Sequence, residues 1–465
     1  MADNAPSSSK RAFTQKYSGK QIFILVSIIM VVLLLDTTII RVSDLTLKST
    51  SSWPIGLFTI IAAICLVGQN LILRFIKLKV DESLAVQKSL RLNSIYKLAV
   101  TVHYILAAIL VFVILQMLIA SRYDVVFLIS ALAISYVFAI IMMVILCHRF
   151  FSWFRLNKSY IMLLYGLSSI MLVANICVTL GLVNSLLVDK PREVTPRASS
   201  LNVPSVSTNP VNSTLNYAYI ITTITSFIIT WCATIGLLKN YIHKMGKFRY
   251  SLVLILPLAY FVSQFLFFSL GLLGSLLISN PIFYGIIFTM LFTLSKPIGG
   301  IIFGIGFWMV AKNIHKDNIV RNYLIISAYG FLLLFTSNQA VVLIFTQYPP
   351  FGLVTICFVG LSSYLVLLGI YSSAISMSQD ANLRREIRRL AIRELELLDR
   401  IGSAQKEEEI RKRVLIVARL NRSNVAAEVG VPSALDEEDV NQYLVDVLKE
   451  IKTIKKQGSF TNGNP

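Results

Sequence analysis

Two charged residues stand inside otherwise apolar segments of this 465-residue chain. Lys296 lies in the middle of an apolar segment of roughly residues 282–311, directly before Pro297, and Asp36 lies toward the end of the segment 21–40. A lysine at the centre of a bilayer costs about 2.5–3.5 kcal/mol on insertion scales, and a proline removes a backbone donor and favours a kink. The pattern therefore predicts a cationic site at a helix break, which binds an anionic group or controls a path.

An alternative needs no ligand. A long tilted segment allows Lys296 to extend its amine toward the headgroups or to pair with Asp36. Asn175 and Gln264 lie in other apolar segments, and they are candidates for lining a ligand site together with Lys296. Hydrogen bonding between helices is the simpler role for both of these side chains.

The elements that must position these residues are membrane helices. Apolar residues make up 55% of the chain and charged residues only 14%, with a mean hydropathy of +0.71, whereas soluble domains carry about 25% charged residues. Ten segments are long and apolar enough to cross a bilayer about 30 Å thick. The sequence therefore predicts an all-α bundle of ten membrane-spanning helices. The segments are roughly 21–40, 53–76, 98–120, 125–147, 160–188, 217–238, 251–279, 282–311, 323–346 and 351–375.

The basic residues alternate between the two sides of these segments. Segments on the side of the N-terminus hold 20 Lys and Arg residues outside the C-terminal tail, and those on the other side hold 6. Because basic residues stay in the cytoplasm, we expect a multi-pass protein of the cell membrane with both termini cytoplasmic. The net charge of +19 then reflects topology, and no nucleic-acid partner is expected.

Three regions follow from this topology: a cytoplasmic N-terminal tail (1–20), a membrane domain (21–378) and a cytoplasmic helical tail (379–465). The longest outer loop, 189–216, is rich in Pro, Ser and Thr and is predicted to be flexible. It contains a glycosylation sequon at Asn212.

Gly300 and Gly304 have the spacing that allows another membrane helix to approach closely.

The tail is predicted to form three helices. The first ends at Gly402, the second runs from Ile410 to Ala418, and the third opens at Ser433. Five arginines after the last span stack on one side of a helix, where they bind anionic lipid headgroups or simply anchor the topology. They are Arg384, Arg385, Arg388, Arg389 and Arg393.

Apolar residues in the third tail helix follow the seam of a short coiled coil. This seam must pack on another helix, either Ile410 to Leu420 of the same tail or the tail of a second subunit, so a homo-oligomer or a cytoplasmic protein partner is expected. The seam residues are Val440, Leu444, Val447, Ile451 and Ile454.

Several chemistries find no support in the sequence. No P-loop for nucleotides and no H-E-x-x-H zinc motif occurs, and the four histidines are far apart in the chain. We therefore expect no enzyme activity, no metal and no cofactor. The cysteines all lie within or at the ends of apolar segments, where they act as small apolar residues.

The last span and the start of the tail carry a resemblance to a known group of proteins. Residues Tyr371 to Asp380 and Leu397 to Ala404 resemble an uncharacterised family of multi-spanning membrane proteins of ammonia-oxidising archaea. The resemblance implies an archaeal cell membrane and no known activity.

We expect a membrane sensor or scaffold whose helical cytoplasmic tail binds partners. The alternative is a transporter or channel with a cationic intramembrane site around Lys296. The large tail without catalytic motifs favours the first, and the ten spans favour the second.

Overall fold

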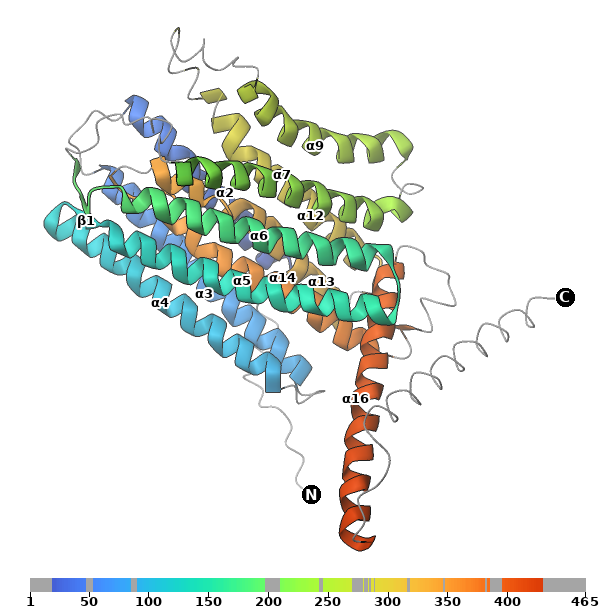
Figure 1. Ribbon diagram of the computed structural model, residues 1–465. Helices are drawn as coiled ribbons and strands as arrows, with labels where there is room; N and C mark the ends of the chain where they lie inside the picture. The colour runs from blue at the N-terminus through green and yellow to red at the C-terminus, as the bar shows by residue number, and fades with distance from the viewer. Residues whose placement is uncertain are drawn as a thin grey trace.

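The computed structural model describes residues 19–46, 53–84, 90–196, 210–241, 246–269, 279, 283, 286–287, 289–315, 318–345, 348–380, 383–384 and 395–429. Long helices pack side by side into one bundle (Figure 1). Ten of the helices are long and apolar enough to cross a membrane, which confirms the predicted all-α, multi-pass architecture.

The first half of the bundle contains helices α2 (Gly19–Thr46), α3 (Trp53–Leu84), α4 (Leu90–Ala120), α5 (Val125–Leu156) and α6 (Tyr160–Val188). The second half contains α7 (Pro210–Leu238), η2 (Lys239–Tyr241), α9 (Lys247–Ser269), η3 (Thr289–Thr293), α12 (Leu294–Lys312), α13 (Ile319–Ser337), η4 (Ala340–Phe345) and α14 (Leu353–Gln379). The helix α16 (Glu396–Val429) follows.

A short antiparallel pair of strands marks one end of the bundle, and α16 marks the other (Figure 1). Strands β1 (Tyr123–Asp124) and β2 (Glu193–Val194) pair through Tyr123 and Val194. We call these two ends the strand end and the α16 end. Asp124 also caps α5, because its carboxylate accepts a hydrogen bond from the Val126 N–H at 2.9 Å.

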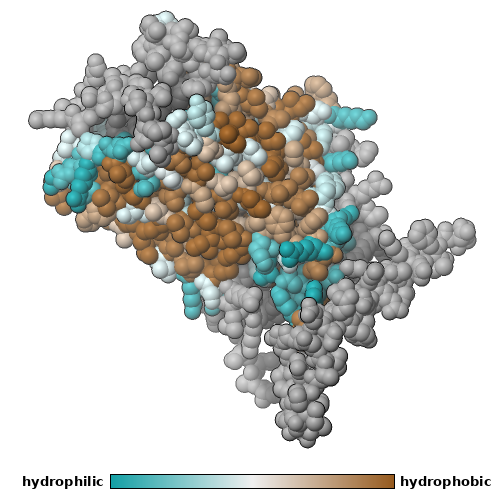
Figure 2. Space-filling model, viewed as in Figure 1, coloured by the Kyte–Doolittle hydropathy of each residue, from teal (hydrophilic) through white to brown (hydrophobic). Residues whose placement is uncertain are grey.

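The outer surface of the bundle is apolar between its two ends. Figure 2 shows a broad hydrophobic surface with hydrophilic residues gathered at the strand end and near α16. Large apolar side chains are exposed along several helices, for example Ile28 of α2, Ile60 of α3 and Leu115 of α4. Since soluble proteins rarely expose such large apolar patches, this surface is the one that contacts lipid.

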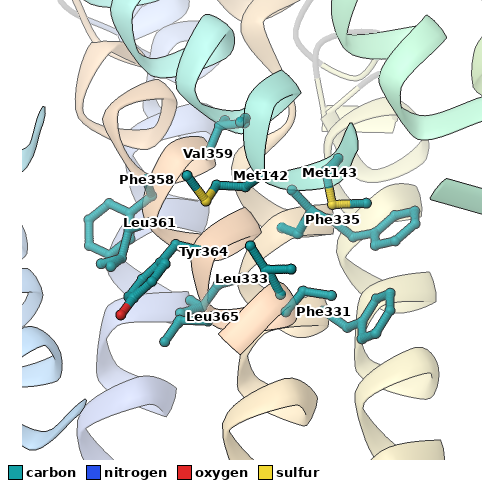
Figure 3. Close-up of a cluster of buried hydrophobic side chains, with 14 of the residues drawn as sticks. Met142, Met143, Phe331, Leu333, Phe335, Phe358, Val359, Leu361, Tyr364 and Leu365 are labelled. Carbon is teal, nitrogen blue, oxygen red and sulfur yellow. The ribbon is translucent and has the colours of Figure 1, made fainter. Parts of the chain in front are cut away.

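Helix α14 is the centre of the bundle. Its most apolar window is entirely buried, and it packs most extensively against α13 and also against α5 and α16. Figure 3 shows Met142 and Met143 of α5 beside side chains of α13 and α14, among them Val359 of α14 and Phe335 of α13. A helix that is apolar on all sides and meets protein on all sides is a core helix.

Glycines allow the central helices to approach closely. A Cβ atom at Gly369 of α14 would lie 2.6 Å from the Tyr323 carbonyl oxygen of α13, and one at Gly330 of α13 would lie 2.6 Å from the Val366 nitrogen. The predicted contact at Gly300 and Gly304 is confirmed, since Cβ atoms there would meet Phe335 and the Ala328 carbonyl of α13. Small residues at such crossings bring two backbones together in a membrane.

The structure corrects several predicted boundaries. Helix α7 begins at Pro210 instead of 217, so Asn212 belongs to a helix, is buried and accepts a hydrogen bond from Ser185; proline suits a first helical turn. The described part of the predicted flexible loop is 189–196 together with 210–216. The ninth span is interrupted, because α13 ends at Ser337 and the 3₁₀ helix η4 follows.

The tail also differs from its prediction. Gly402 does not end a helix, because α16 runs from Glu396 through it to Val429 and so joins the end of the first predicted tail helix to the second. A Cβ at this position would lie 2.5 Å from Met377 Cγ of α14. This glycine therefore provides close approach between two helices and not a chain reversal. The third predicted tail helix lies outside the described residues.

Candidate functional site

Two interrupted helices meet beside Lys296. The π-helix η3 leads directly into α12, which begins at Leu294, and the α13–η4 break lies at Asn338 and Gln339. Contacts join the two breaks, as described below. Irregular backbone within a membrane protein is tolerated where protein or a polar cavity satisfies its freed groups.

Pro297 explains how the two breaks are linked. In a regular helix the carbonyl of Thr293 would accept a hydrogen bond from the N–H of residue 297, and proline has none. The side-chain amide of Gln339 donates to that carbonyl instead, at 3.0 Å. Gln339 and Thr293 are both buried, so the amide replaces the donor that the proline removes.

Lys296 lies in the first turn of α12, among the polar groups of this junction. Its Nζ donates to the Tyr219 hydroxyl of α7 at 2.9 Å and to the Asn338 carbonyl at 3.5 Å. The amine also lies 5.0 Å from the centre of the Tyr219 ring, a cation–π distance. Among the described residues no carboxylate pairs with it, and the salt bridge with Asp36 considered above is not formed.

The depth of Lys296 differs from the mid-span position expected from the sequence. The apolar helical segment here is Leu291–Lys312, so Lys296 lies close to its strand-end terminus. Tyr219 and Asn338 lie similarly near that end of their own spans, Asn212–Leu238 and Ile319–Leu343. The site therefore lies in the part of the bundle nearer to the strand end.

Hydrogen bonds extend the site toward the middle of the bundle. The Asn338 amide donates to Asn175 Oδ1 of α6 at 3.1 Å, and the Tyr136 hydroxyl of α5 donates to Asn338 Oδ1 at 3.0 Å. Asn175 in turn donates to Thr223 Oγ1 of α7 at 2.8 Å. Asn175, a predicted site residue, is thus joined to Lys296 through Asn338.

Gln264, the other predicted polar residue, lies on the opposite flank of the junction. Its side-chain oxygen on α9 accepts a hydrogen bond from Ser295, the neighbour of Lys296, at 3.0 Å. Tyr219 and Tyr136 are site residues that the sequence analysis missed. Both tyrosines lie within apolar segments, and no local sequence pattern indicates that their hydroxyl groups belong to a polar site.

A polar seam follows the contact between α6 and α7. Three hydrogen-bonded pairs are spaced along it, from the strand end toward the α16 end. They are Ser185 with Asn212 at 2.9 Å, Asn175 with Thr223 at 2.8 Å and Ser168 with Thr230 at 2.5 Å. Each pair stabilises the helix contact, and together they extend the polarity of the Lys296 site along two neighbouring spans.

Asp36 lies apart from the Lys296 site, at the start of α14. Its Oδ2 accepts hydrogen bonds from the Thr355 N–H at 2.9 Å and from the Thr355 hydroxyl at 2.7 Å. The residue is fully buried. The two charged residues singled out in the sequence therefore belong to two different polar centres.

At the other end of the bundle, α16 docks on α5 and α14 through polar contacts. Trp153 Nε1 of α5 donates to Gln405 Oε1 at 3.0 Å, and Arg149 pairs with Glu408 at 3.0 Å. Burial would raise the pKa of Glu408, but the hydrogen bond and charge of Lys412, the charge of Arg149 and the Ser152 hydroxyl outweigh it, so the pKa is lowered. The ionised carboxylate therefore holds α16 in place.

The predicted lipid-binding arginines are described at one position only. Arg384 follows α14 and is buried, with 9% of its surface exposed, so it packs within the protein rather than spreading over the surface. The other four, Arg385, Arg388, Arg389 and Arg393, lie outside the described residues. The same holds for the seam Val440, Leu444, Val447, Ile451 and Ile454.

One basic residue at the strand end is also embedded. Lys190, just after α6, donates from Nζ to the Leu343 carbonyl of η4 at 3.2 Å. Burial lowers the pKa of Lys190 to about 8. The lysine thus fixes the far end of the interrupted ninth span.

Among the described residues, no group of three or more His, Cys, Asp or Glu side chains is arranged to hold a metal ion. Comparison with protein-family models, with curated proteins and with solved structures gives no match. What the sequence and structure establish is therefore a multi-pass membrane helix bundle with an embedded lysine at the junction of two interrupted helices.

Proposed function

We propose that this protein is a transporter or channel for a small anionic solute, which binds at Lys296. One observation carries the proposal: among the described residues, an embedded lysine without a carboxylate partner lies at the junction of two interrupted helices. Interrupted helices form the substrate sites of many transporters. Ionisable residues within membrane spans are otherwise rare because they are costly.

The electrostatics of the site favour an anion. Lys296 is partly buried in the first turn of α12, where a charge without a counter-charge is costly. The amine has three donors, of which Tyr219 and Asn338 take two. An anionic group would take the third donor and would offset the burial of the charge.

The seam between α6 and α7 supports movement as well as binding. Its three hydrogen-bonded pairs offer successive polar groups along two spans. A solute that leaves Lys296 meets Asn175 through Asn338, and then the hydroxyl groups of Thr223 and Thr230. We infer that the path follows this seam.

Flux into proteoliposomes tests the proposal. The probes are inorganic phosphate, sulfate, nitrate and a small carboxylate, with thermal stabilisation of the purified protein by the same anions as a second readout. Lys296→Met should abolish both effects and Lys296→Arg should retain binding. Lys312→Met, at the far end of the same helix, is the matched control and should change neither. Equal flux and equal stabilisation in Lys296→Met and the wild type, or no effect of any probe, would contradict the proposal.

A membrane sensor or scaffold is the second candidate, and the contact between α14 and α16 favours it. The core helix α14 packs directly on α16, and α16 exposes Ile410, Val414, Ile416 and Val417 beyond that contact. A change in the bundle would reach this apolar surface through α14. A partner protein or a second copy of the chain would bind there, with the seam Val440 to Ile454 as a further contact.

The two functions predict different results for a spin label at Val417→Cys. In a sensor, an anion that binds at Lys296 changes the mobility of the label but does not cross the membrane. In a transporter, flux occurs whether or not α16 responds. Flux without a change at α16 would contradict the sensor.

We further propose that the α16 end faces the cytoplasm of an archaeal cell and that both termini lie there. The proposal is supported by the 20 to 6 distribution of basic residues. A cysteine at position 460 should be protected from an impermeant label in intact cells, and one at position 205 should react. The reverse pattern would contradict this topology. The tail arginines are proposed to bind anionic lipids, and vesicles with and without such lipids test this.

A further inference from the structure

Asp36 is a fully buried carboxylate with an incomplete set of partners. Its exposed surface is 0%. Oδ2 accepts two hydrogen bonds from Thr355, and the backbone N–H of Gly352 also acts on the carboxylate, whereas Oδ1 accepts no hydrogen bond of regular geometry. Among the described residues, no Lys, Arg or His forms an ion pair with it. An ionised carboxylate in such surroundings is costly, because burial of a charge needs a counter-charge or a full set of donors.

One role of this carboxylate is structural. The N-cap of α14 is Gly352, which has a φ of 89° and no side chain to cap the helix. Thr355 N–H is one of the donors that a helix start leaves without an intrahelical partner. Asp36 of α2 accepts from it at 2.9 Å and thus caps α14 from a neighbouring helix. Capping by itself requires an acceptor oxygen and not a negative charge.

The hydroxyl of Thr355 indicates a second role. Thr355 Oγ1 lies 2.7 Å from Asp36 Oδ2 and 3.2 Å from the carbonyl oxygen of Leu33. A hydroxyl has a single hydrogen, so it donates to one of these oxygens at a time. With an ionised Asp36, the hydroxyl donates to the carboxylate. With a protonated Asp36, the carboxyl O–H donates to Thr355 Oγ1, and the threonine donates to Leu33.

The geometry thus fits both protonation states, and the neutral state leaves no buried charge. We propose that Asp36 is a proton-binding site, in which the uptake of one proton from water on Oδ2 switches the Thr355 hydroxyl from the carboxylate to the Leu33 carbonyl. Release of that proton reverses the switch. Atoms and charge balance, since the carboxylate gains one proton and one positive charge.

The neighbours of Asp36 do not compete for this role. The titratable side chains that act on it are the thiols of Cys65 on α3 and Cys357 on α14. Neither η3 nor α14 contains a charged residue within its bounds, and the charged residues of α3 and α13 lie in the halves nearer to the α16 end. Helix α2 itself also carries Arg41 and Asp44, whose side chains are outside the described part of the chain. Among the described side chains around it, Asp36 is therefore the carboxylate that changes charge.

The position of this site suggests a link with the anion. Helix α2 packs against η3 and α13, the two elements that carry the breaks beside Lys296. A proton on Asp36 that moves with a monovalent anion on Lys296 would make transport electroneutral. This coupling rests on the proposed function, whereas the proton site itself does not.

Infrared difference spectroscopy of the full-length protein in lipid tests the proton site. The wild type should show the carbonyl stretch of a protonated carboxyl group, which shifts in D₂O and disappears as the pH rises. Asp36→Asn should lack that band. Asp124→Asn, at the half-buried cap of α5, is the matched control and should retain it. A wild-type spectrum without any band that Asp36→Asn removes would overturn the proposal.

A second variant covers the case in which Asp36→Asn does not fold. Thr355→Val removes the hydroxyl but keeps the backbone N–H, so the carboxyl band should shift in frequency. An unchanged band would overturn the hydroxyl switch. Coupling is measured separately, as proton uptake into proteoliposomes on addition of nitrate. A carboxyl band that persists without proton uptake contradicts the coupling but not the proton site. Loss of anion flux in Lys296→Met with an unchanged carboxyl band supports the anion site and the proton site separately.

Discussion

Replacing Gln339 by leucine should lower the free energy of unfolding, because it leaves the Thr293 carbonyl without the donor that compensates for Pro297 in α12. Leucine keeps much of the volume of the side chain but removes the amide that donates to the Thr293 carbonyl at 3.0 Å. Hydrogen bonds between membrane helices contribute about 0.6 kcal/mol on average and up to about 1.7, whereas an orphaned buried acceptor costs about 1–3 kcal/mol. Because Pro297 leaves the carbonyl without its helical donor, we expect a loss near the upper membrane value, about 1.5–2 kcal/mol.

The decisive measurement is a double-mutant cycle. Pro297→Ala supplies an N–H to the Thr293 carbonyl, so it should rescue most of the loss in the Gln339→Leu background, with a coupling energy of about 1 kcal/mol or more. Equilibrium unfolding by SDS titration in mixed micelles gives the free energies. Pro257→Ala, at a proline in the interior of α9, is the control and should not rescue. If the two changes at 297 and 339 are simply additive, Gln339 does not compensate for the proline and the reasoning fails.

Three further predictions concern the two ends of the bundle. Gly402→Leu should displace α16, because a Cβ there would lie 2.5 Å from Met377 Cγ; protease cleavage of α16 in the folded protein should become faster. The lowered pKa of Glu408 means that docking of α16 is stabilised above the ordinary value of 4.5 and weakens as the pH falls through the lowered one, and Glu408→Gln should remove this dependence of the cleavage rate. Burial lowers the pKa of Lys190 to about 8 from an ordinary 10.5. Between these two values the unfolded chain binds more protons than the folded one, so thermal stability should rise with pH in that range. Lys190→Met should flatten that rise.

The composition of the spans was enough to predict their number. Apolar segments long enough for a bilayer leave few alternatives, since every backbone group must be satisfied within a helix or a closed sheet. The spacing of Gly300 and Gly304 likewise predicted the close contact with α13. The length of a span and the spacing of its glycines can both be read from a single segment of the sequence, without knowledge of what it packs against.

The interruption at Asn338 and Gln339 could not be predicted in the same way. No glycine or proline marks it, and the side chains of Asn338 and Gln339 are hydrogen-bonded to residues far away in the chain, such as Tyr136 and Thr293. Gly402 shows the opposite error, because a glycine that usually ends a helix serves here as a point of contact with Met377. The partner of Asp36 was missed because Thr355 is 319 positions away.

The burial of α14 has a consequence for the biogenesis of the protein. This helix is the last of the ten described spans to leave the ribosome, and its apolar sequence is suited to enter lipid directly. In the folded protein its surroundings are protein instead, with α13 and α5 against its sides. The nine earlier spans therefore have to leave an opening when they assemble, or separate again, so that the final span can move from lipid into the centre. Closure around α14 then becomes the step that completes the described bundle, and a chain truncated before residue 353 lacks the core helix of that bundle.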